Sequence, residues 1–277
     1  MKKIKKIVHI SDIHFRTFKR HDEYKEILIE VINSIKEETS EYDFDEIRIV
    51  ITGDIVHQKI TISNELTVIV AWFLDECSKL AETIIIAGNH DLLANNKDRL
   101  DSLTPIIGLM KNENISYFKK SGCYIDENII WAVYSVFDDN TQPQDITETK
   151  NKNKSKTVVG LFHGPVIGSK TALGYEFTDV GVHIDYFSGC DMVLLGDIHK
   201  RNFFEFDDNG KKIPMAFSGS LIQQDFGESI TGHGYLIWDV ETKTYDEIDV
   251  ESDYGFYQYT IDSIDDINNE NEKLTNI

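Results

Sequence analysis

Five short apolar runs in this chain each end in a turn that carries Gly, Asp, Asn or His. The turns are D-x-H at residues 12–14, G-D at 53–54, G-N-H-D at 88–91, H-G at 163–164 and G-D-x-H at 196–199. In the first 125 residues, a helical pattern of apolar residues follows each strand-like run. Because parallel strands need a long crossover connection, these repeated units predict a parallel sheet with helices packed on it.

The spacing of apolar residues predicts where the elements lie. Before residue 125, strands are expected at 6–10, 46–52 and 83–87, and helices at 22–38, 66–81 and 103–111. Later runs with hairpin-like spacing predict strands at 124–125, 129–136, 158–162, 192–195, 215–218 and 235–240. Residues 141–156 carry almost no apolar side chains and are expected to form an exposed, mobile loop. We therefore predict an α/β fold, a sandwich of two mixed sheets flanked by helices.

The turns that end these runs offer strong metal ligands. The carboxyl ends of parallel strands share one edge of a sheet, so these distant turns are expected to meet in one crevice. A single Asp or His at a strand end is often only a turn former or a helix N-cap, but five such ends together indicate a common site. Carboxylate, imidazole and amide groups together suit Mn²⁺, Fe or Zn²⁺ better than Ca²⁺. Seven donors fit two ions about 3.5–4 Å apart that share a bridging carboxylate: Asp12, His14, Asp54, Asn89, His163, Asp197 and His199.

Composition limits the compartment and the partners. The chain has 28 Lys and Arg against 48 Asp and Glu, a net charge of −20, so its surface as a whole does not attract a polyanion. No apolar run approaches the ~18 residues of a membrane span, and the apolar stretch after the basic N-terminus is too short for a secretion signal. Three cysteines far apart in the sequence are expected to be reduced and buried. These features favour a cytoplasmic protein that does not act at a membrane.

The order of the motifs resembles that of the calcineurin-like metallophosphoesterase superfamily. S-D-I-H, G-D-I-V-H, G-N-H-D, H-G and G-D-I-H follow one another between Ile7 and about Asp239. The resemblance implies the metallophosphoesterase fold in a domain of residues 1–252, a centre of two divalent metal ions and hydrolysis of phosphoric esters. Residues 253–277, with six acidic residues and one Lys, would be a flexible acidic tail or the start of a further segment.

The resemblance also implies a role for each donor. It assigns Asp12, His14 and His199 to the first metal, Asn89, His163 and Asp197 to the second, and Asp54 to both as the bridge. The family usually has His where this chain has Asp197, and a carboxylate there is expected to favour Mn²⁺ or Mg²⁺ over softer ions. The alternative is that Asp197 has lost this role and the second metal binds weakly. His90 would assist the leaving oxygen, with its ring held by Asp91.

Further features resemble one branch, the SbcD and Mre-type DNA repair and recombination nucleases, which include phage recombination nuclease subunits. His57 follows Asp54 by three residues, as in that branch, and would be catalytic. Residues 20–23 at the start of the first helix, and the segments 218–221 and 226–228, are also similar to it. The branch implies a metal-dependent DNA exonuclease or endonuclease with an SMC-like ATPase as partner and a homodimeric assembly. Mn²⁺ would be the preferred metal.

Two features weaken a prediction of tight, independent DNA binding. That branch continues into a DNA-binding cap domain, whereas only about 25 residues follow Ser252 here, and the net charge is −20. Cations near the metal motifs could still contact backbone phosphates: Arg16, Lys19, Arg20, Lys200 and Arg201. The alternatives are a small-substrate phosphoesterase, either a phosphomonoesterase or a cyclic-nucleotide phosphodiesterase, and a catalytically silent scaffold subunit suggested only by Asp197.

Overall fold

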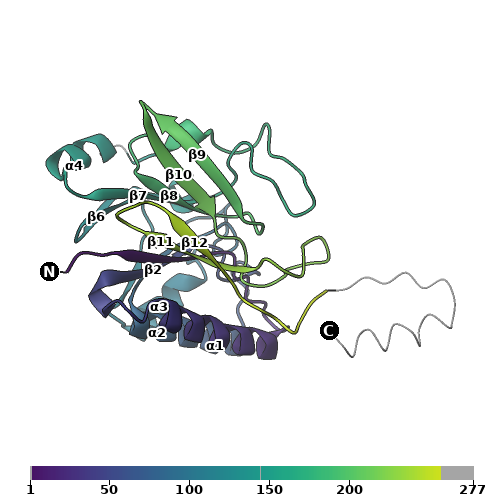
Figure 1. Ribbon diagram of the computed structural model, residues 1–277. Coiled ribbons are helices and arrows are strands. Elements are labelled where there is room, and N and C mark those ends of the chain that lie inside the picture. Colours follow the sequence, from purple (N-terminus) through teal and green to yellow (C-terminus); the bar gives the residue numbers. More distant parts are fainter. Residues whose placement is uncertain (1, 144, 257–277) are drawn as a thin grey trace, which may run out of the picture.

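Two six-stranded sheets lie face to face at the centre of the molecule, in a computed structural model that describes residues 2–143 and 145–256. Helices cover the outer side of each sheet, and most of the helical mass lies against the sheet that contains the N-terminal strand (Figure 1). The predicted α/β sandwich of two mixed sheets is therefore confirmed. The predicted tail falls outside the described residues from 257 onward.

The first sheet contains the strands that precede the first three motifs. Its spatial order is β12-β11-β1-β2-β3-β4. Strands β1 to β4 run parallel to one another, and β11 runs antiparallel to both β1 and β12. All six residues of β2 are buried, as expected for a strand covered on both faces. The bounds are Lys6–Ile10 (β1), Ile47–Thr52 (β2), Glu82–Ile86 (β3), Ile115–Tyr117 (β4), Gly234–Asp239 (β11) and Tyr245–Asp249 (β12).

The second sheet has the order β5-β6-β7-β8-β10-β9. Its four central strands are parallel, and only the edge strands β5 and β9 pair antiparallel, as hairpins with β6 and β10. The hairpin connections expected from the spacing of these runs are therefore wrong for β6, β7 and β8. These strands are parallel, and crossover segments connect them. The bounds are Gly122–Asp126 (β5), Ile129–Tyr134 (β6), Thr157–His163 (β7), Met192–Gly196 (β8), Asn202–Asp208 (β9) and Lys211–Phe217 (β10).

Three apolar layers hold the fold together. One lies between the first sheet and the helices α1 (His21–Glu38), α2 (Asn64–Leu80) and α3 (Leu103–Met110). A second lies between the sheets and includes the fully buried Trp131 and Trp238. The third lies on the outer face of the second sheet. Because strands are covered on both faces, their carboxyl ends are where polar side chains can be presented.

The expectation that residues 141–156 form an exposed, mobile loop is wrong. This segment contains the helix α4 (Ile146–Lys152), which buries Ile146 in the third apolar layer instead of forming an exposed loop. The sequence patterns also missed β4, β9 and β12. β9 alternates half-buried and exposed residues and β12 is mostly exposed, so neither has the continuous apolar run of a central strand.

The composition predicted reduced, buried cysteines and no membrane-spanning segment. Cys77 and Cys190 are buried, whereas Cys123 is only half-buried, and all three are free thiols. Over residues 2–143 and 145–256, none of the helices combines the length and apolar character needed to cross a membrane.

Candidate metal centre

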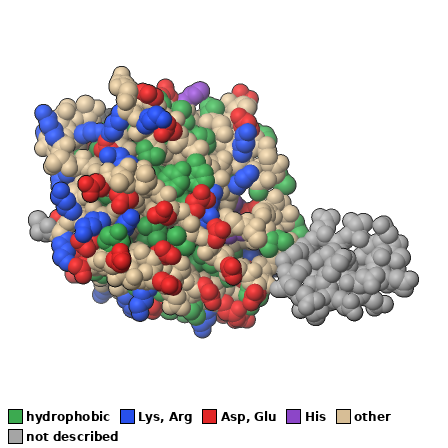
Figure 2. All heavy atoms as spheres, viewed as in Figure 1, with side chains coloured by type: hydrophobic (Ala, Val, Ile, Leu, Met, Phe, Trp, Pro, Cys, Tyr) green, Lys and Arg blue, Asp and Glu red, His purple; other side chains and the backbone are tan. Residues whose placement is uncertain are grey.

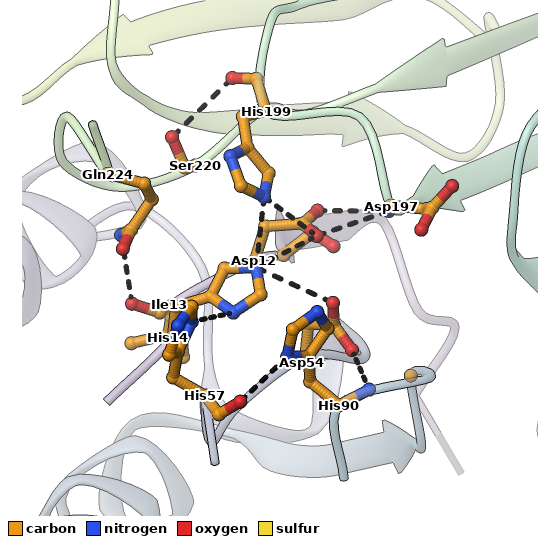
Figure 3. A network of polar contacts seen from close by, with 12 residues as sticks. Asp12, Ile13, His14, Asp54, His57, His90, Asp197, His199, Ser220 and Gln224 are labelled. Carbon is orange, nitrogen blue, oxygen red and sulfur yellow. Dashed lines mark hydrogen bonds and ion pairs between the residues drawn. The ribbon is translucent and has the colours of Figure 1, made fainter. Parts of the chain in front are cut away.

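The five motif turns meet at one place, between the two sheets. Those after β1, β2 and β3 come from the first sheet, and those after β7 and β8 come from the second. Figure 3 shows residues of the turns after β1, β2, β3 and β8 side by side. Helix α1 supports the first turn, because the Tyr24 hydroxyl donates to the His14 carbonyl at 2.6 Å. Several donors have left-handed backbone angles, with φ of 52° at Asp12, His14 and Asp54 and 104° at Asp197. Such strain in residues other than glycine is characteristic of functional sites.

One group of donors surrounds the His14 imidazole. Its Nε2 lies 2.9 Å from His199 Nε2, 3.4 Å from Asp54 Oδ2 and 3.9 Å from Asp12 Oδ1. These atoms come from turns after three strands, and all but those of His199 are buried. The group has the nitrogen and oxygen composition expected of a transition-metal site.

A second group lies on the other side of Asp54. His163 Nε2 is 3.4 Å from Asp54 Oδ1 and 3.7 Å from Asp197 Oδ1. The Asn89 Nδ2–H donates to the same Asp197 oxygen at 3.0 Å. Figure 3 shows the Asp197 carboxylate turned away from the His14–His199 pair. Asp54 therefore presents one oxygen to each group, which is the geometry of a bridging carboxylate.

The histidines are oriented as metal ligands require. His163 Nδ1–H donates to the Thr52 carbonyl at 2.7 Å, and His199 Nδ1–H donates to Glu228 Oε1 at 2.5 Å. Both rings therefore direct Nε2 toward the donor groups. His163 Nε2 is buried and has no hydrogen-bond partner in the described part of the chain. A buried nitrogen without a partner, close to two carboxylates, fits a divalent cation.

The pKa values of the site reflect charges crowded in a buried space. Burial alone would lower the pKa of His163, but the Asp54 carboxylate beside it, together with Asp12 and Asp197, raises it well above its usual value. Burial raises the pKa of Asp12 to about 6, and it also raises the pKa of Asp197. A site that perturbs carboxyl and imidazole pKa values together is a candidate functional site. Cations bound here would replace the protons that these groups otherwise share.

Glycines let the turns approach one another. A Cβ on Gly88 would lie 2.1 Å from Asp54 Oδ1, and one on Gly196 would lie 2.2 Å from the Thr52 carbonyl. We expect Gly88→Ala to displace Asp54, to lower the free energy of unfolding by about 1–3 kcal/mol and to weaken metal binding. Thermal denaturation and calorimetric metal titration measure both effects. Gly108→Ala is the control, because a Cβ there meets nothing within 4 Å; equal effects of the two substitutions would contradict this view of the site.

Sequence comparison agrees with this geometry. Residues 5–201 match the sequence model of the family described as calcineurin-like phosphoesterase, a span that includes all seven donors. The chain belongs to this family. A calcineurin-like phosphoesterase is a metal-dependent hydrolase acting on phosphoric ester bonds. A relative from Acanthamoeba polyphaga mimivirus, uncharacterized protein R555, is 42% identical over 258 residues, which are 91% of this chain and 18% of that protein. The chain thus spans less than a fifth of its relative's length.

Two further histidines line the same phosphoesterase centre. The rings of His57 and His90 stack with centroids 5.2 Å apart, and both lie edge-on to the ring of His14. The expectation that Asp91 holds the His90 ring is wrong. Asp91 is fully buried and accepts from the backbone N–H groups of Val56 and Gly88, at 3.0 and 2.8 Å. The ring of His90 is held instead by the His57 carbonyl, to which its Nδ1–H donates at 2.7 Å.

The expected phosphate-binding cations divide into two kinds. Arg20 forms an ion pair with Glu23 and donates to the Gln223 carbonyl, and Arg201 forms ion pairs with Asp249 and Glu247. These pairings engage both guanidinium groups within the chain, and the phosphate-binding role of Arg20 and Arg201 stays a prediction.

Arg16, Lys19 and Lys200 are the other candidates, and Lys19 is exposed. Arg16 Nη1 lies 3.3 Å from His57 Nε2, so this cation is at the edge of the centre, and Lys200 is exposed directly after His199. Which of them contacts phosphate stays a prediction.

Glu228 is the functional residue that sequence reasoning missed. It was noted only as part of a segment similar to the nuclease branch, yet its carboxylate holds the ring of His199. Its other oxygen accepts from the Gln224 N–H at 2.8 Å, which fixes the carboxylate in place. No short-range pattern links residues 29 positions apart, so only the fold reveals this pair.

We expect Glu228→Gln to weaken metal binding by about 10- to 100-fold, as loss of a carboxylate behind a ligand histidine usually does. Calorimetric titration with Mn²⁺ measures the change. Glu205→Gln, which removes a carboxylate from the surface strand β9, should leave the affinity unchanged. Unchanged affinity in Glu228→Gln would mean that His199 does not depend on this carboxylate.

Proposed function

We propose that this protein is a metal-dependent phosphodiesterase that cleaves DNA, with a centre of two divalent ions. The observation that carries the proposal is the position of Asp54, with one carboxylate oxygen toward His14 and the other toward His163. Two divalent ions held there would supply the positive charge that stabilises a phosphoester transition state. In this proposal Asp12, His14 and His199 hold one ion, and Asn89, His163 and Asp197 hold the other.

The remaining side chains position the ester and move a proton. His90 keeps a proton on Nδ1, which donates to the His57 carbonyl, so Nε2 is the atom that exchanges a proton with the leaving oxygen. Burial, and then the neighbouring Arg16, lower the pKa of His57 to about 4, so its ring is neutral and acts as a hydrogen-bonding group. Arg16 Nη1 lies 3.3 Å from His57 Nε2, so this guanidinium group would contact the phosphate.

His57 and Glu228 are the reason that we propose DNA as the substrate. His57 adds a neutral imidazole to the mouth of the centre, and Glu228 belongs to the segment similar to the SbcD and Mre-type branch. Within this proposal, the preferred metal is Mn²⁺, the partner is an SMC-like ATPase, the assembly is a homodimer and the location is intracellular.

A small-substrate phosphoesterase is the second candidate, and charge favours it. Arg20 and Arg201 are neutralised by acidic partners, and the net charge is −20. On the face seen in Figure 2, Lys and Arg lie among Asp and Glu and form no continuous basic surface. DNA binding depends strongly on such cations. The two candidate functions therefore differ in whether the protein surface binds a long polyanion such as DNA.

One assay separates the two candidates. The protein is incubated with Mn²⁺ and either labelled single-stranded DNA, labelled double-stranded DNA or bis-p-nitrophenyl phosphate. Cleavage of DNA together with the small diester supports the nuclease. Cleavage of the small diester alone, at equal enzyme concentration and low salt, would contradict it and leave the small-substrate phosphoesterase.

Metal affinity is expected to rise with pH. Burial would lower the pKa of His199, but its hydrogen bond to Glu228 and the nearby Asp12 raise it to about 9 in the metal-free protein. A metal must displace this proton, so the apparent affinity should increase up to about pH 9 and then level off. Calorimetric titration with Mn²⁺ at several pH values measures the slope. An affinity independent of pH between 6 and 8 would contradict a ligand role for His199.

A further inference from the structure

A hollow of about 380 Å³ opens directly beside the metal centre. One wall is formed by Asp197 and His199, each from a different group of the centre. Another part of the wall comes from the loop after β7, with Ala172, Leu173 and Phe177. Because Asp197 and His199 line both the metal centre and the hollow, a substituent on a phosphate bound at the centre can reach into the hollow.

The part of this loop that lines the hollow is held by its own contacts. Phe177 N–H donates to the Ser169 carbonyl at 3.0 Å, and Lys170 forms an ion pair with Glu176 at 3.1 Å. Leu173 stands at the tip, with 81% of its surface exposed. It rests against Gly227, where an added Cβ would lie 3.2 Å from Leu173 Cδ1. The hollow is therefore closed on that side by contact between two segments far apart in the sequence.

The charge of the hollow excludes a second phosphate. Asp225 and Glu228 contribute carboxylates, and no Lys or Arg lines it among the described residues. Asp225 Oδ1 accepts from the Gly227 N–H at 2.7 Å, while Oδ2 takes no hydrogen bond within the described part of the chain. Apolar side chains with a free carboxylate oxygen suit an uncharged group that is flat or apolar and carries hydrogen-bond donors.

We propose that this hollow holds the nucleoside, base and sugar together, of the nucleotide whose phosphate lies at the metal centre. Its size is within the range of small-ligand sites, about 300–1,000 Å³. The Phe177 ring and the Leu173 side chain offer apolar contact to a base, and Asp225 offers an acceptor to base or sugar donors. This inference rests on the proposed phosphodiesterase function and adds a specificity site to it.

Two substrates with the same leaving group test the inference. One is the p-nitrophenyl ester of thymidine 5′-monophosphate, and the other is methyl p-nitrophenyl phosphate, which replaces the nucleoside with a methyl group. With Mn²⁺ bound, we expect kcat/KM to be at least about tenfold higher for the thymidine ester. Equal values for the two diesters would overturn the inference while leaving the phosphodiesterase intact.

Ala172→Trp narrows the hollow from the loop after β7 and leaves all seven metal donors in the sequence. It should reduce kcat/KM for the thymidine ester to the level of the methyl ester and leave the methyl ester within about twofold. Val180→Trp, on the exposed surface of the same loop, is the matched control and should change neither value. Equal losses for both diesters in Ala172→Trp would show that the hollow does not bind the nucleoside.

Equilibrium binding separates failure of this inference from failure of the proposed function. Thymidine 5′-monophosphate is expected to bind the Mn²⁺-loaded protein at least about tenfold tighter than methyl phosphate, and Ala172→Trp should remove the difference. That result without hydrolysis of either diester would contradict the phosphodiesterase but keep the nucleoside site. Equal affinities would overturn the nucleoside site whether or not the diesters are hydrolysed.

Discussion

Replacing Asp54 with Asn is expected to lower the rate of phosphoester hydrolysis by on the order of 10³-fold or more. Burial disfavours the charged form of this carboxyl, but His163 and His14 hold its pKa below the usual value, so it is ionised and ready to bind cations. The amide that replaces it is neutral and presents only one oxygen. The donor groups around His14 and around His163 would both lose the ligand that they share, and this accounts for the expected size of the loss.

The control for Asp54→Asn must separate loss of metal from loss of fold. Circular dichroism and thermal denaturation should show a folded chain, since Asp54 lies in a turn after β2 and not in an apolar layer. Asp246→Asn, an identical change on the exposed strand β12, should leave the rate unchanged. A folded Asp54→Asn variant with wild-type rate and metal content would refute the bridging assignment.

Replacing Asp197 with Ala is expected to cost on the order of 10²-fold in rate, because one half of a two-metal clamp would be lost. Asp197 lies between His163 and Asn89, on the side of Asp54 away from His14. Burial raises the pKa of its carboxyl, so the charge there is costly until a cation neutralises it. The Ala variant should therefore keep the first ion and bind the second weakly.

Asp197→His is the informative partner of that variant. It places the family's usual imidazole at this position, and we expect activity to be retained with a metal preference shifted away from hard ions. Metal counting on purified protein distinguishes the variants, and Asp246→Ala serves as the surface control. Two ions retained at wild-type affinity in Asp197→Ala would contradict a ligand role for Asp197.

The convergence of the donors was predictable because parallel strands place their carboxyl ends at a common edge. The runs before Asp12, Asp54 and Asn89 are mostly apolar and are each followed by a helical pattern, so their boundaries and direction followed from the sequence. That His163 and Asp197 reach the site from a second sheet was harder to predict from the sequence. The parallel order of β6, β7 and β8 depends on long crossover segments that short-range periodicity does not encode.

Side-chain partners were the least predictable part of the site. Adjacency in sequence suggested that Asp91 would hold His90, but the turn directs Asp91 inward to backbone N–H groups. Arg201 lies two residues after the motif residue His199, yet it pairs with Asp249 on β12, a strand that no apolar pattern marked. Charge and spacing alone cannot say which neighbour a long side chain reaches, because that depends on tertiary packing.

The most direct test of the central claim is anomalous diffraction from crystals grown with Mn²⁺. The account predicts two anomalous peaks about 3.5–4 Å apart, on either side of the Asp54 carboxylate. One peak should lie within coordination distance of His14 and His199, and the other within that distance of His163 and Asp197. A single peak, or peaks away from Asp54, would contradict a two-metal centre built from these five turns.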